Sequence, residues 1–345
     1  MPVPTLALDN IDYATKTPYQ TQIPVLGLGT WQSKDEEVTR AVVHALTRTE
    51  LRHIDCAQGY LNEAAVGAGI KAAIHASEQS GYAGPKLSRA DIFVTSKVWG
   101  TWHNRVEEAL DATLKKLDLE YLDLYLIHWP IPLNPQGTPE NALIPTLPSG
   151  ERDVIYPRSE KGAKINFVET WRQMEKLVGL QGKVRSIGVS NFSKANLEIL
   201  LKDREDGSKP VKPAVNQLEL HVYNPQHKLV KYLLEAEIRP QAYSPLGSTG
   251  SPLLADAVVI DIANRHQLKP ADVLIGYLIH KNIITVAKSV NPARISANVA
   301  GPLQALEKLQ PSDIATLDGL AATGKQKRFI KPVWPAGLLK FEDWD

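Results

Sequence analysis

The sequence alternates short apolar runs with longer amphipathic stretches, and this alternation repeats eight times along the chain. Short apolar runs are typical of buried strands, and apolar residues spaced three or four positions apart are typical of helices. Strands that alternate with helices indicate a parallel sheet covered by helices. Eight repeats favour a sheet that closes into a barrel over an open doubly wound sheet. We therefore expect an α/β fold, the (β/α)8 TIM barrel.

The expected strands lie at 24–29, 53–55, 92–97, 122–128, 184–189, 214–217, 239–243 and 283–288. The expected helices cover about 35–47, 62–79, 105–117, 167–179, 195–201, 226–235, 253–266, 270–280 and 311–322.

Two long stretches fall outside this alternation. The stretch 130–164 contains seven prolines, which exclude a continuous helix or a central strand. The stretch 324–345 forms a tail. Long loops in compact domains tend to be functional or disordered. We expect residues 1–345 to form a single domain, with a substrate loop at about 130–164 after the fourth strand and a C-terminal loop at about 324–345.

The amino-acid composition limits the kinds of partner that we expect this protein to bind. Charged residues make up 22% of the chain and leave a formal net charge of +1, whereas binding to nucleic acid requires a basic excess. No apolar stretch approaches the length of a membrane span, and the N-terminus does not resemble a secretion signal. The single cysteine, Cys56, fits a reducing compartment. We expect a cytoplasmic protein, a monomer or weak homodimer, without nucleic-acid or membrane partners.

Polar side chains follow the expected strands at their carboxyl ends. In α/β barrels these ends gather at one mouth, where the chemistry takes place. Each residue alone has an ordinary structural explanation, such as a turn former for an aspartate or a solvated surface position for a lysine. One polar group per loop, all directed to one mouth, indicates a functional site. The residues are Thr30, Asp55, Lys97, His128, Ser190, Asn191, Gln217, Tyr243, Ser244, Lys288 and Ser289.

Several motifs in this set resemble the aldo-keto reductase family. The nine residues from Asp55 to Glu63, Asp-Cys-Ala-Gln-Gly-Tyr-Leu-Asn-Glu, are similar to that family's signature. The motif from Leu26 to Trp31 looks like its first strand, and the motif from Ile187 to Phe192 looks like its fifth. Val215-Asn216-Gln217, Tyr243-Ser244-Pro245-Leu246 and Lys288-Ser289 follow in the family's order. The resemblance covers about 23–299 and implies an enzyme that reduces a carbonyl to the alcohol, reversibly.

The resemblance implies a catalytic tetrad of Asp55, Tyr60, Lys97 and His128. Carbonyl reduction needs a hydride, which no side chain supplies, and a proton at the carbonyl oxygen. Tyr60 would donate that proton, and a neighbouring Lys97 would lower the tyrosine pKa from its free value of about 10. Asp55 would hold Lys97 by an ion pair. His128 would orient the substrate oxygen.

The resemblance also implies NADP(H) as cofactor. Tyr243 would stack on the nicotinamide, and Ser190, Asn191 and Gln217 would bind its carboxamide. Lys288 and Arg294 would bind the 2′-phosphate, because two cations suit a dianionic group. The full expected cofactor set is Gly29, Thr30, Asp55, Ser190, Asn191, Gln217, Tyr243, Ser244, Pro245, Leu246, Ser248, Lys288, Ser289, Val290, Arg294 and Asn298. The sequence lacks the motifs of common metal sites, so we expect no metal.

The substrate pocket is expected to have aromatic walls. Its residues would be Trp31, Tyr60, Trp99, His128, Trp129 and Trp334. The substrate itself remains open among sugars, polyols, aldehydes and ketones. Gly67 and Gly69 fit a nucleotide-loop spacing but fall inside an expected helix, which favours a role in helix packing.

Two other functions remain as alternatives. One is a nucleotide-binding interaction or regulatory subunit on the same fold, and the tetrad argues against a purely structural role of that kind. The other is an unrelated barrel hydrolase that uses Asp55 with a second carboxylate. That alternative leaves Tyr60, Lys97 and the Lys288–Arg294 pair unexplained.

Overall fold

A closed barrel of parallel strands forms the centre of the described structure. The computed structural model describes residues 2–134, 143–147, 149, 153, 166–205, 207–332 and 339–341. Within these residues, eight strands pair in the order β10-β3-β4-β5-β6-β7-β8-β9 and close into a barrel, so the expected fold is confirmed. The barrel strands are β3 Leu26–Gly29, β4 His53–Asp55, β5 Phe93–Val98, β6 Leu124–Ile127, β7 Ile187–Ser190, β8 Val215–Glu219, β9 Arg239–Tyr243 and β10 Ile284–Lys288.

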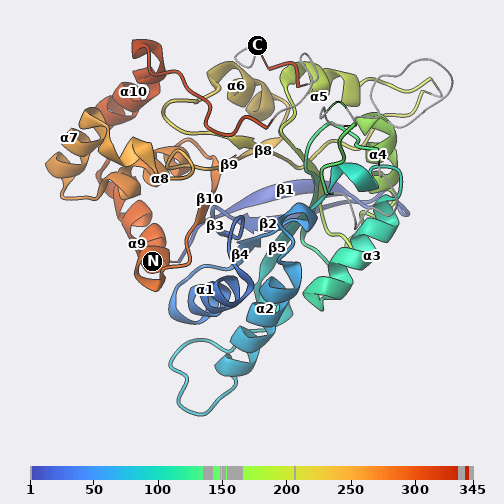
Figure 1. The fold of residues 1–345 in the computed structure, drawn as a ribbon, viewed down its shortest axis with the longest axis horizontal. Helices are drawn as coiled ribbons and strands as arrows, with labels where there is room; N and C mark the ends of the chain where they lie inside the picture. Colours follow the sequence, from blue (N-terminus) through green and yellow to red (C-terminus); the bar gives the residue numbers. More distant parts are fainter. Residues whose placement is uncertain are drawn as a thin grey trace.

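Helices surround this barrel (Figure 1). They are α1 Asp35–Arg48, α2 Glu63–Ser77, α3 Val106–Leu117, α4 Phe167–Glu175, α5 Lys194–Leu200, α6 His227–Glu235, α7 Ala257–His266, α8 Pro270–His280, α9 Pro292–Lys308 and α10 Pro311–Gly319. Short 3-10 turns are η1 Gln58–Tyr60, η2 Arg89–Asp91, η3 Gly100–Trp102, η4 Pro252–Ala255 and η5 Ala321–Thr323. Most helices present one apolar face to the strands, which buries the main core between the two layers.

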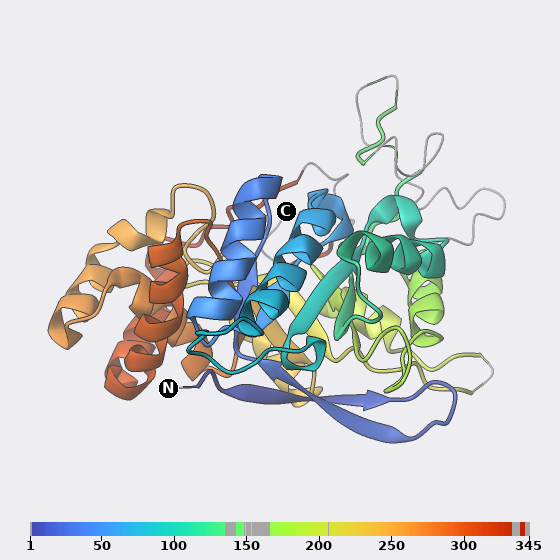
Figure 2. The same ribbon diagram turned by 90° about the horizontal axis from the view of Figure 1, so that it is seen from below.

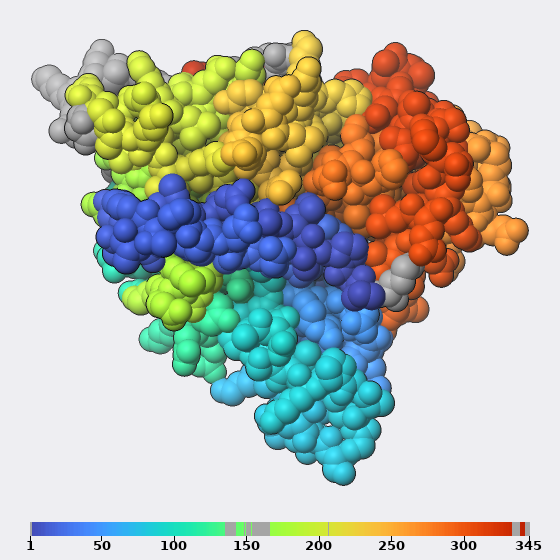
Figure 3. All heavy atoms as spheres, turned by 180° about the vertical axis from the view of Figure 1, so that it is seen from behind, coloured from blue at the N-terminus to red at the C-terminus, as the bar shows by residue number. Residues whose placement is uncertain are grey.

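An antiparallel hairpin, which we did not expect, covers the amino ends of the barrel strands. Its strands are β1 Thr5–Ile11 and β2 Pro18–Pro24. It lies beneath the barrel in Figure 2 and crosses the back of the molecule in Figure 3. Leu8 and Ile23 of the hairpin pack with Phe93 and Leu124 of the barrel strands. The hairpin therefore occupies one end of the barrel and leaves the carboxyl ends of the strands for a site.

Helix α9 was also absent from the expected helices. A Gly301-Pro302 pair lies inside it, and such a pair normally interrupts a helix because proline lacks the N–H donor. The structure shows why glycine is suited here. A Cβ added at Gly301 would lie 1.9 Å from Asp272 Oδ1 on α8, so the two helices approach too closely for a side chain. Tertiary packing thus accommodates a local sequence that disfavours a helix.

The expected packing role of Gly67 and Gly69 is confirmed. Both lie in α2, where a Cβ at Gly67 would stand 2.1 Å from the backbone oxygen of Leu117 at the end of α3. A Cβ at Gly69 would stand 2.8 Å from Val42 Cβ on α1. The glycines therefore let α2 pack closely between its two neighbours. None of the helices in the described ranges combines the length and apolar character needed to cross a membrane.

Candidate active site

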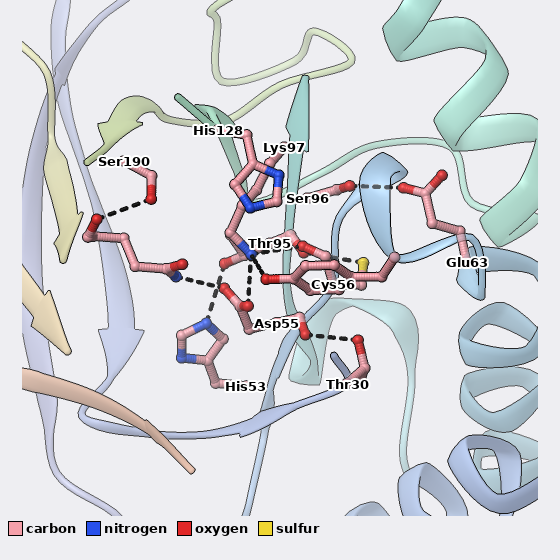
Figure 4. A network of polar contacts seen from close by, with 12 residues as sticks. Thr30, His53, Asp55, Cys56, Glu63, Thr95, Ser96, Lys97, His128 and Ser190 are labelled. Atoms are coloured by element: carbon pink, nitrogen blue, oxygen red, sulfur yellow. Dashed lines mark hydrogen bonds and ion pairs between the residues drawn. The ribbon is translucent and has the colours of Figure 1, made fainter. Parts of the chain in front are cut away.

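The ammonium group of Lys97 lies at the centre of the polar cluster at the barrel mouth. Lys97 belongs to β5, and its side chain is fully buried. Its Nζ donates hydrogen bonds to Asp55 Oδ1 at 2.6 Å, to the backbone oxygen of Cys56 at 2.9 Å and to Tyr60 Oη at 3.3 Å. An ammonium has three N–H donors, so each is used once. Figure 4 shows Lys97 directed at Asp55, with the His128 ring beside it.

Tyr60 receives this hydrogen bond from Lys97 and keeps its own O–H free to donate elsewhere. It lies in η1, immediately after β4, with its ring half-buried. Burial raises the pKa of Tyr60 to about 12, and the nearby Lys97 charge lowers it only in part. Lys97 acts in the expected direction and lowers this pKa, but burial raises it by more, so the net pKa lies above that of free tyrosine. The desolvation of the phenolate outweighs the attraction of one cation that Asp55 already neutralises.

His128 follows β6 and faces the tyrosine. Its ring lies 5.5 Å from the Tyr60 ring and 5.2 Å from the Trp99 ring, with both contacts edge-on. Burial lowers the pKa of His128 well below its usual value, and the charge on Lys97 lowers it further. The imidazole is therefore neutral, so one ring nitrogen can donate a hydrogen bond while the other accepts.

The second oxygen of the Asp55 carboxylate extends the cluster across the barrel. Asp55 Oδ2 accepts a hydrogen bond from Gln217 Nε2 on β8 at 2.7 Å. Ser190 Oγ, at the end of β7, donates to the backbone oxygen of Gln217 at 2.9 Å. Asn191 adopts a left-handed φ of 63° and donates to the backbone oxygen of His128, while its own Oδ1 accepts from Tyr243 Oη at 2.8 Å. The expected carboxamide-binding residues are therefore brought together, and Gln217 also supports Asp55.

The remaining residues expected to bind the cofactor form two further groups around the mouth. Thr30 lies beside Asp55, with Oγ1 donating to the Asp55 backbone oxygen at 3.0 Å, and Gly29 pairs in register with Lys288 of β10. The loop after β9 contains Ser244, Pro245, Leu246 and Ser248, and β10 leads through Lys288, Ser289 and Val290 into α9, which contains Arg294 and Asn298. Lys288 and Arg294 are exposed, and they flank the N-terminus of α9.

The tryptophans expected to line the pocket differ in their surroundings. Trp99 and Trp129 are buried, whereas Trp31 is 39% exposed. Trp99 Nε1 donates to the backbone oxygen of Leu143, so a described part of the long loop after β6 docks beside His128. Trp334 lies outside the described residues.

Two buried residues next to the tetrad were not expected to take part in the site. Gln58 Oε1 accepts from the backbone N–H of Trp99 at 3.2 Å. Glu63 accepts from Ser96 Oγ at 2.7 Å, and burial raises the pKa of the Glu63 carboxyl. Both lie in the Asp55–Glu63 motif, so the sequence signal was present. These contacts hold η1 and the start of α2 against β5, which orients Tyr60.

No cluster of three histidine, cysteine, aspartate or glutamate side chains suited to a metal ion occurs within the described ranges. Fold and site together define a barrel with a buried Asp–Lys–Tyr cluster and a neutral histidine at its mouth. The aldo/keto reductase family matches residues 25–322. The chain belongs to this family of oxidoreductases.

Individual relatives match along most of their length. A D-galacturonate reductase from Hypocrea jecorina is 42% identical over 321 residues, which cover 92% of this chain and 94% of that protein. A glycerol 2-dehydrogenase (NADP(+)) from Saccharomyces cerevisiae is 39% identical over 91% of this chain and 92% of its own. The structure of an aldose reductase from Schistosoma japonicum superposes with a TM-score of 0.74, at 38% identity, covering 89% of this chain and 90% of that one.

Proposed function

We propose that this protein reduces an aldehyde or ketone, including the carbonyl of an open-chain sugar, to the alcohol with NADPH, and that Tyr60 delivers the proton. The observation that carries the proposal is the position of Lys97 Nζ, which is buried and hydrogen-bonded to both Asp55 and Tyr60. The same geometry supports an enzyme over an interaction or regulatory subunit, because binding alone does not require a buried cation beside a phenol.

Tyr60 acts as the general acid. Its O–H remains protonated across the neutral range because its pKa is about 12. As the carbonyl oxygen gains negative charge, the tyrosine transfers its proton to that oxygen. The phenolate formed on Tyr60 is stabilised by Lys97 at 3.3 Å, and Asp55 keeps the ammonium in place. In the reverse direction the same phenolate accepts the proton of the alcohol.

His128 orients the carbonyl oxygen. The neutral imidazole faces Tyr60, so a carbonyl oxygen placed between the two rings can accept one hydrogen bond from each. The hydrogen bond from Asn191 to the backbone oxygen of His128 fixes the start of the loop that bears this ring. Trp99, in edge-on contact with His128, excludes water from the same side.

The residues around the mouth fit NADP(H). Ser190, Asn191 and Gln217 offer amide and hydroxyl groups to a carboxamide, and the Tyr243 ring lies beside them. Left-handed backbone at Ser244 and Ser248 is the kind found in anion-binding nests. Exposed Lys288 and Arg294 at the N-terminus of α9 suit a dianionic phosphate. When bound, the nicotinamide supplies the hydride.

The names of the relatives support polyhydroxy carbonyl compounds as substrates. They include a D-galacturonate reductase, an aldehyde reductase and a glycerol 2-dehydrogenase that carries NADP(+) in its name. The test is NADPH oxidation with D-galacturonate, D-glyceraldehyde, dihydroxyacetone and a simple aromatic aldehyde. We expect turnover with at least the hydroxyaldehydes, and no oxidation of NADPH with any of the four would refute the proposal.

Three further properties belong to the proposal. Residues 1–345 act as one domain, the protein is a monomer or weak homodimer, and it works in the cytoplasm on a small-molecule substrate. One family model covers residues 25–322, which supports a single domain, and the single cysteine supports a reducing compartment such as the cytoplasm. Sedimentation and cell fractionation test them.

A further inference from the structure

The carboxylate of Glu219 ties the C-terminal segment to the mouth of the barrel. Glu219 ends β8, two residues after Gln217, and it is fully buried. Its Oε1 accepts hydrogen bonds from His221 Nε2 at 2.9 Å and from the backbone N–H of Phe329 at 2.6 Å. Its Oε2 accepts one from the backbone N–H of Ile330 at 2.9 Å. One side chain therefore holds two consecutive amides that lie more than 100 residues further along the chain.

His221 completes this anchor and has a defined tautomer. Its Nδ1 accepts a hydrogen bond from the backbone N–H of Tyr223 at 3.2 Å, so Nε2 carries the proton and donates it to Glu219. The His221 ring is buried and lies 5.2 Å from the Phe329 ring. Every partner of the Glu219 carboxylate in the described structure is thus an N–H donor, which suits an acceptor-only group.

Phe329 connects the anchored segment to the loop that follows β9. A Cβ added at Gly247 would lie 3.1 Å from Phe329 Cε2, so the aromatic ring packs directly on that loop. Gly247 has a φ of 89°, a conformation that favours glycine. At the other end of the loop, Tyr243 is the register partner of Glu219 in the β8–β9 pair. The loop is therefore in contact with the Glu219 anchor at its start and at its turn.

A second anchor holds the same segment without Phe329. Lys325 Nζ donates to Asp256 Oδ2 at 2.5 Å, and Asp256 also accepts from the backbone of the first turn of α7. After α10 the described tail residues run towards α6, and the backbone oxygen of Leu339 accepts a hydrogen bond from Asn196 on α5 (Figure 1). The segment is therefore held at two points, by Glu219 and by Asp256.

We propose that Glu219 is a positioning residue that couples the C-terminal segment Lys325–Ile330 to the loop Ser244–Ser248, so that both open and close as one unit. This inference rests on the proposed function, in which that loop lines the NADP(H) site. Loss of the Glu219 hydrogen bonds then has two consequences at once. The segment Lys325–Ile330 loosens, and the loop releases the cofactor faster, while the Asp55–Tyr60–Lys97 geometry stays in place.

The test compares Glu219→Gln with Phe329→Ala. We expect Glu219→Gln to speed hydrogen exchange at the Phe329 and Ile330 amides by about tenfold or more, since hydrogen bonds to charged groups are strong. NADPH dissociation, followed by its fluorescence, should rise several-fold, and KM for the carbonyl should rise with it. The single-turnover rate of the bound complex should stay within about twofold of wild type. Phe329→Ala should speed NADPH dissociation while Ile330 remains protected from exchange.

A matched control variant isolates the effect. Glu175→Gln removes a carboxylate that is equally buried but lies on α4 and binds Arg204 and the Val211 backbone. It should leave NADPH dissociation at the wild-type rate.

Unchanged NADPH dissociation in Phe329→Ala, or in a Glu219→Gln variant whose tail amides exchange freely, would overturn the coupling. If Glu219→Gln does not fold, Phe329→Ala decides the question. Exchange and NADPH dissociation need no turnover, so a wild-type protein that binds NADPH but reduces no carbonyl would refute the proposed function and still leave the coupling measurable.

Discussion

Lys97 Nζ lies 2.6 Å from Asp55 Oδ1, and both side chains are almost completely shielded from water. Removing either partner leaves an uncompensated charge inside the barrel. The resulting loss in folding free energy is larger than the net stabilisation that the intact pair provides. The pair therefore contributes both to the stability of the fold and to catalysis. It keeps a cation beside Tyr60, where a phenolate must form.

Replacement of Tyr60 by phenylalanine should abolish carbonyl reduction and leave cofactor binding intact. A general acid typically contributes about 10²–10⁴ in rate, and no other O–H in the described site receives a hydrogen bond from Lys97. Steady-state turnover and NADPH fluorescence titration measure the two effects. Tyr82→Phe is the matched control, because that hydroxyl binds the Thr47 backbone away from the site. Activity of Tyr60→Phe within a few-fold of wild type would contradict the assignment.

Replacement of Lys97 by methionine should lower the free energy of unfolding by about 3–5 kcal/mol, because Asp55 is left buried without its cation. The double variant Asp55→Asn/Lys97→Met should recover part of that stability and none of the activity. Urea denaturation of the single and double variants gives the coupling energy of the pair. Additive losses in the double variant would mean that the two charges do not interact as the geometry implies.

Alanine at Lys288 or Arg294 should weaken NADPH binding far more than NADH binding. Each cation is exposed beside the N-terminus of α9, and loss of one hydrogen bond to a charged group costs about tenfold in affinity or more. Dissociation constants for both cofactors, measured at two salt concentrations, test this. Lys281→Ala, at the end of α8, is the control. Equal losses for NADPH and NADH would show that these residues do not bind the 2′-phosphate.

Acid should destabilise the fold through its buried neutral histidines. Burial lowers the pKa of His103 to about 3 and that of His53 to about 4, so the unfolded chain takes up protons first as the pH falls below 6.5. The neutral histidines therefore contribute their full stability above pH 6.5, and this contribution is lost as the pH falls towards 3. In this window, His103→Gln should reduce the slope of the free energy of unfolding against pH by about 1.4 kcal/mol per pH unit. His75→Gln, at an exposed position, should not change it. Equal slopes in all three proteins would refute this explanation.

Alanine at Gly67 should destabilise the protein by more than about 2 kcal/mol, since the new methyl group would overlap the Leu117 backbone oxygen and force α2 and α3 apart. Gly319→Ala, which meets no atom within 4 Å, is the control and should be neutral or slightly stabilising. Thermal unfolding of both variants measures the difference in their stability. A Gly67→Ala protein as stable as Gly319→Ala would mean that the helices can separate at little cost.

Much of the fold could be predicted because its signals are local. The alternation of apolar runs and amphipathic stretches is set by side-chain periodicity, and parallel strands joined by helices have few ways to close. The order of the strands along the chain also places Asp55, Lys97 and His128 at the ends of successive strands. The β1–β2 hairpin and α9 were missed for different reasons. The hairpin is short and half-polar, and α9 contains a Gly-Pro pair, a local signal that disfavours a helix.

The order of residues along the chain by itself determined the barrel, its polar mouth and the identity of the groups gathered there. Tertiary structure alone decided their protonation and their partners. The pKa of Tyr60 depends on how completely the folded chain removes it from water, and Lys97 offsets only part of that burial. The contact between Glu219 and the amides of Phe329 and Ile330 joins residues 110 and 111 positions apart. No local pattern records that contact, because it forms only when the barrel has closed and residues 329 and 330 lie against the end of β8.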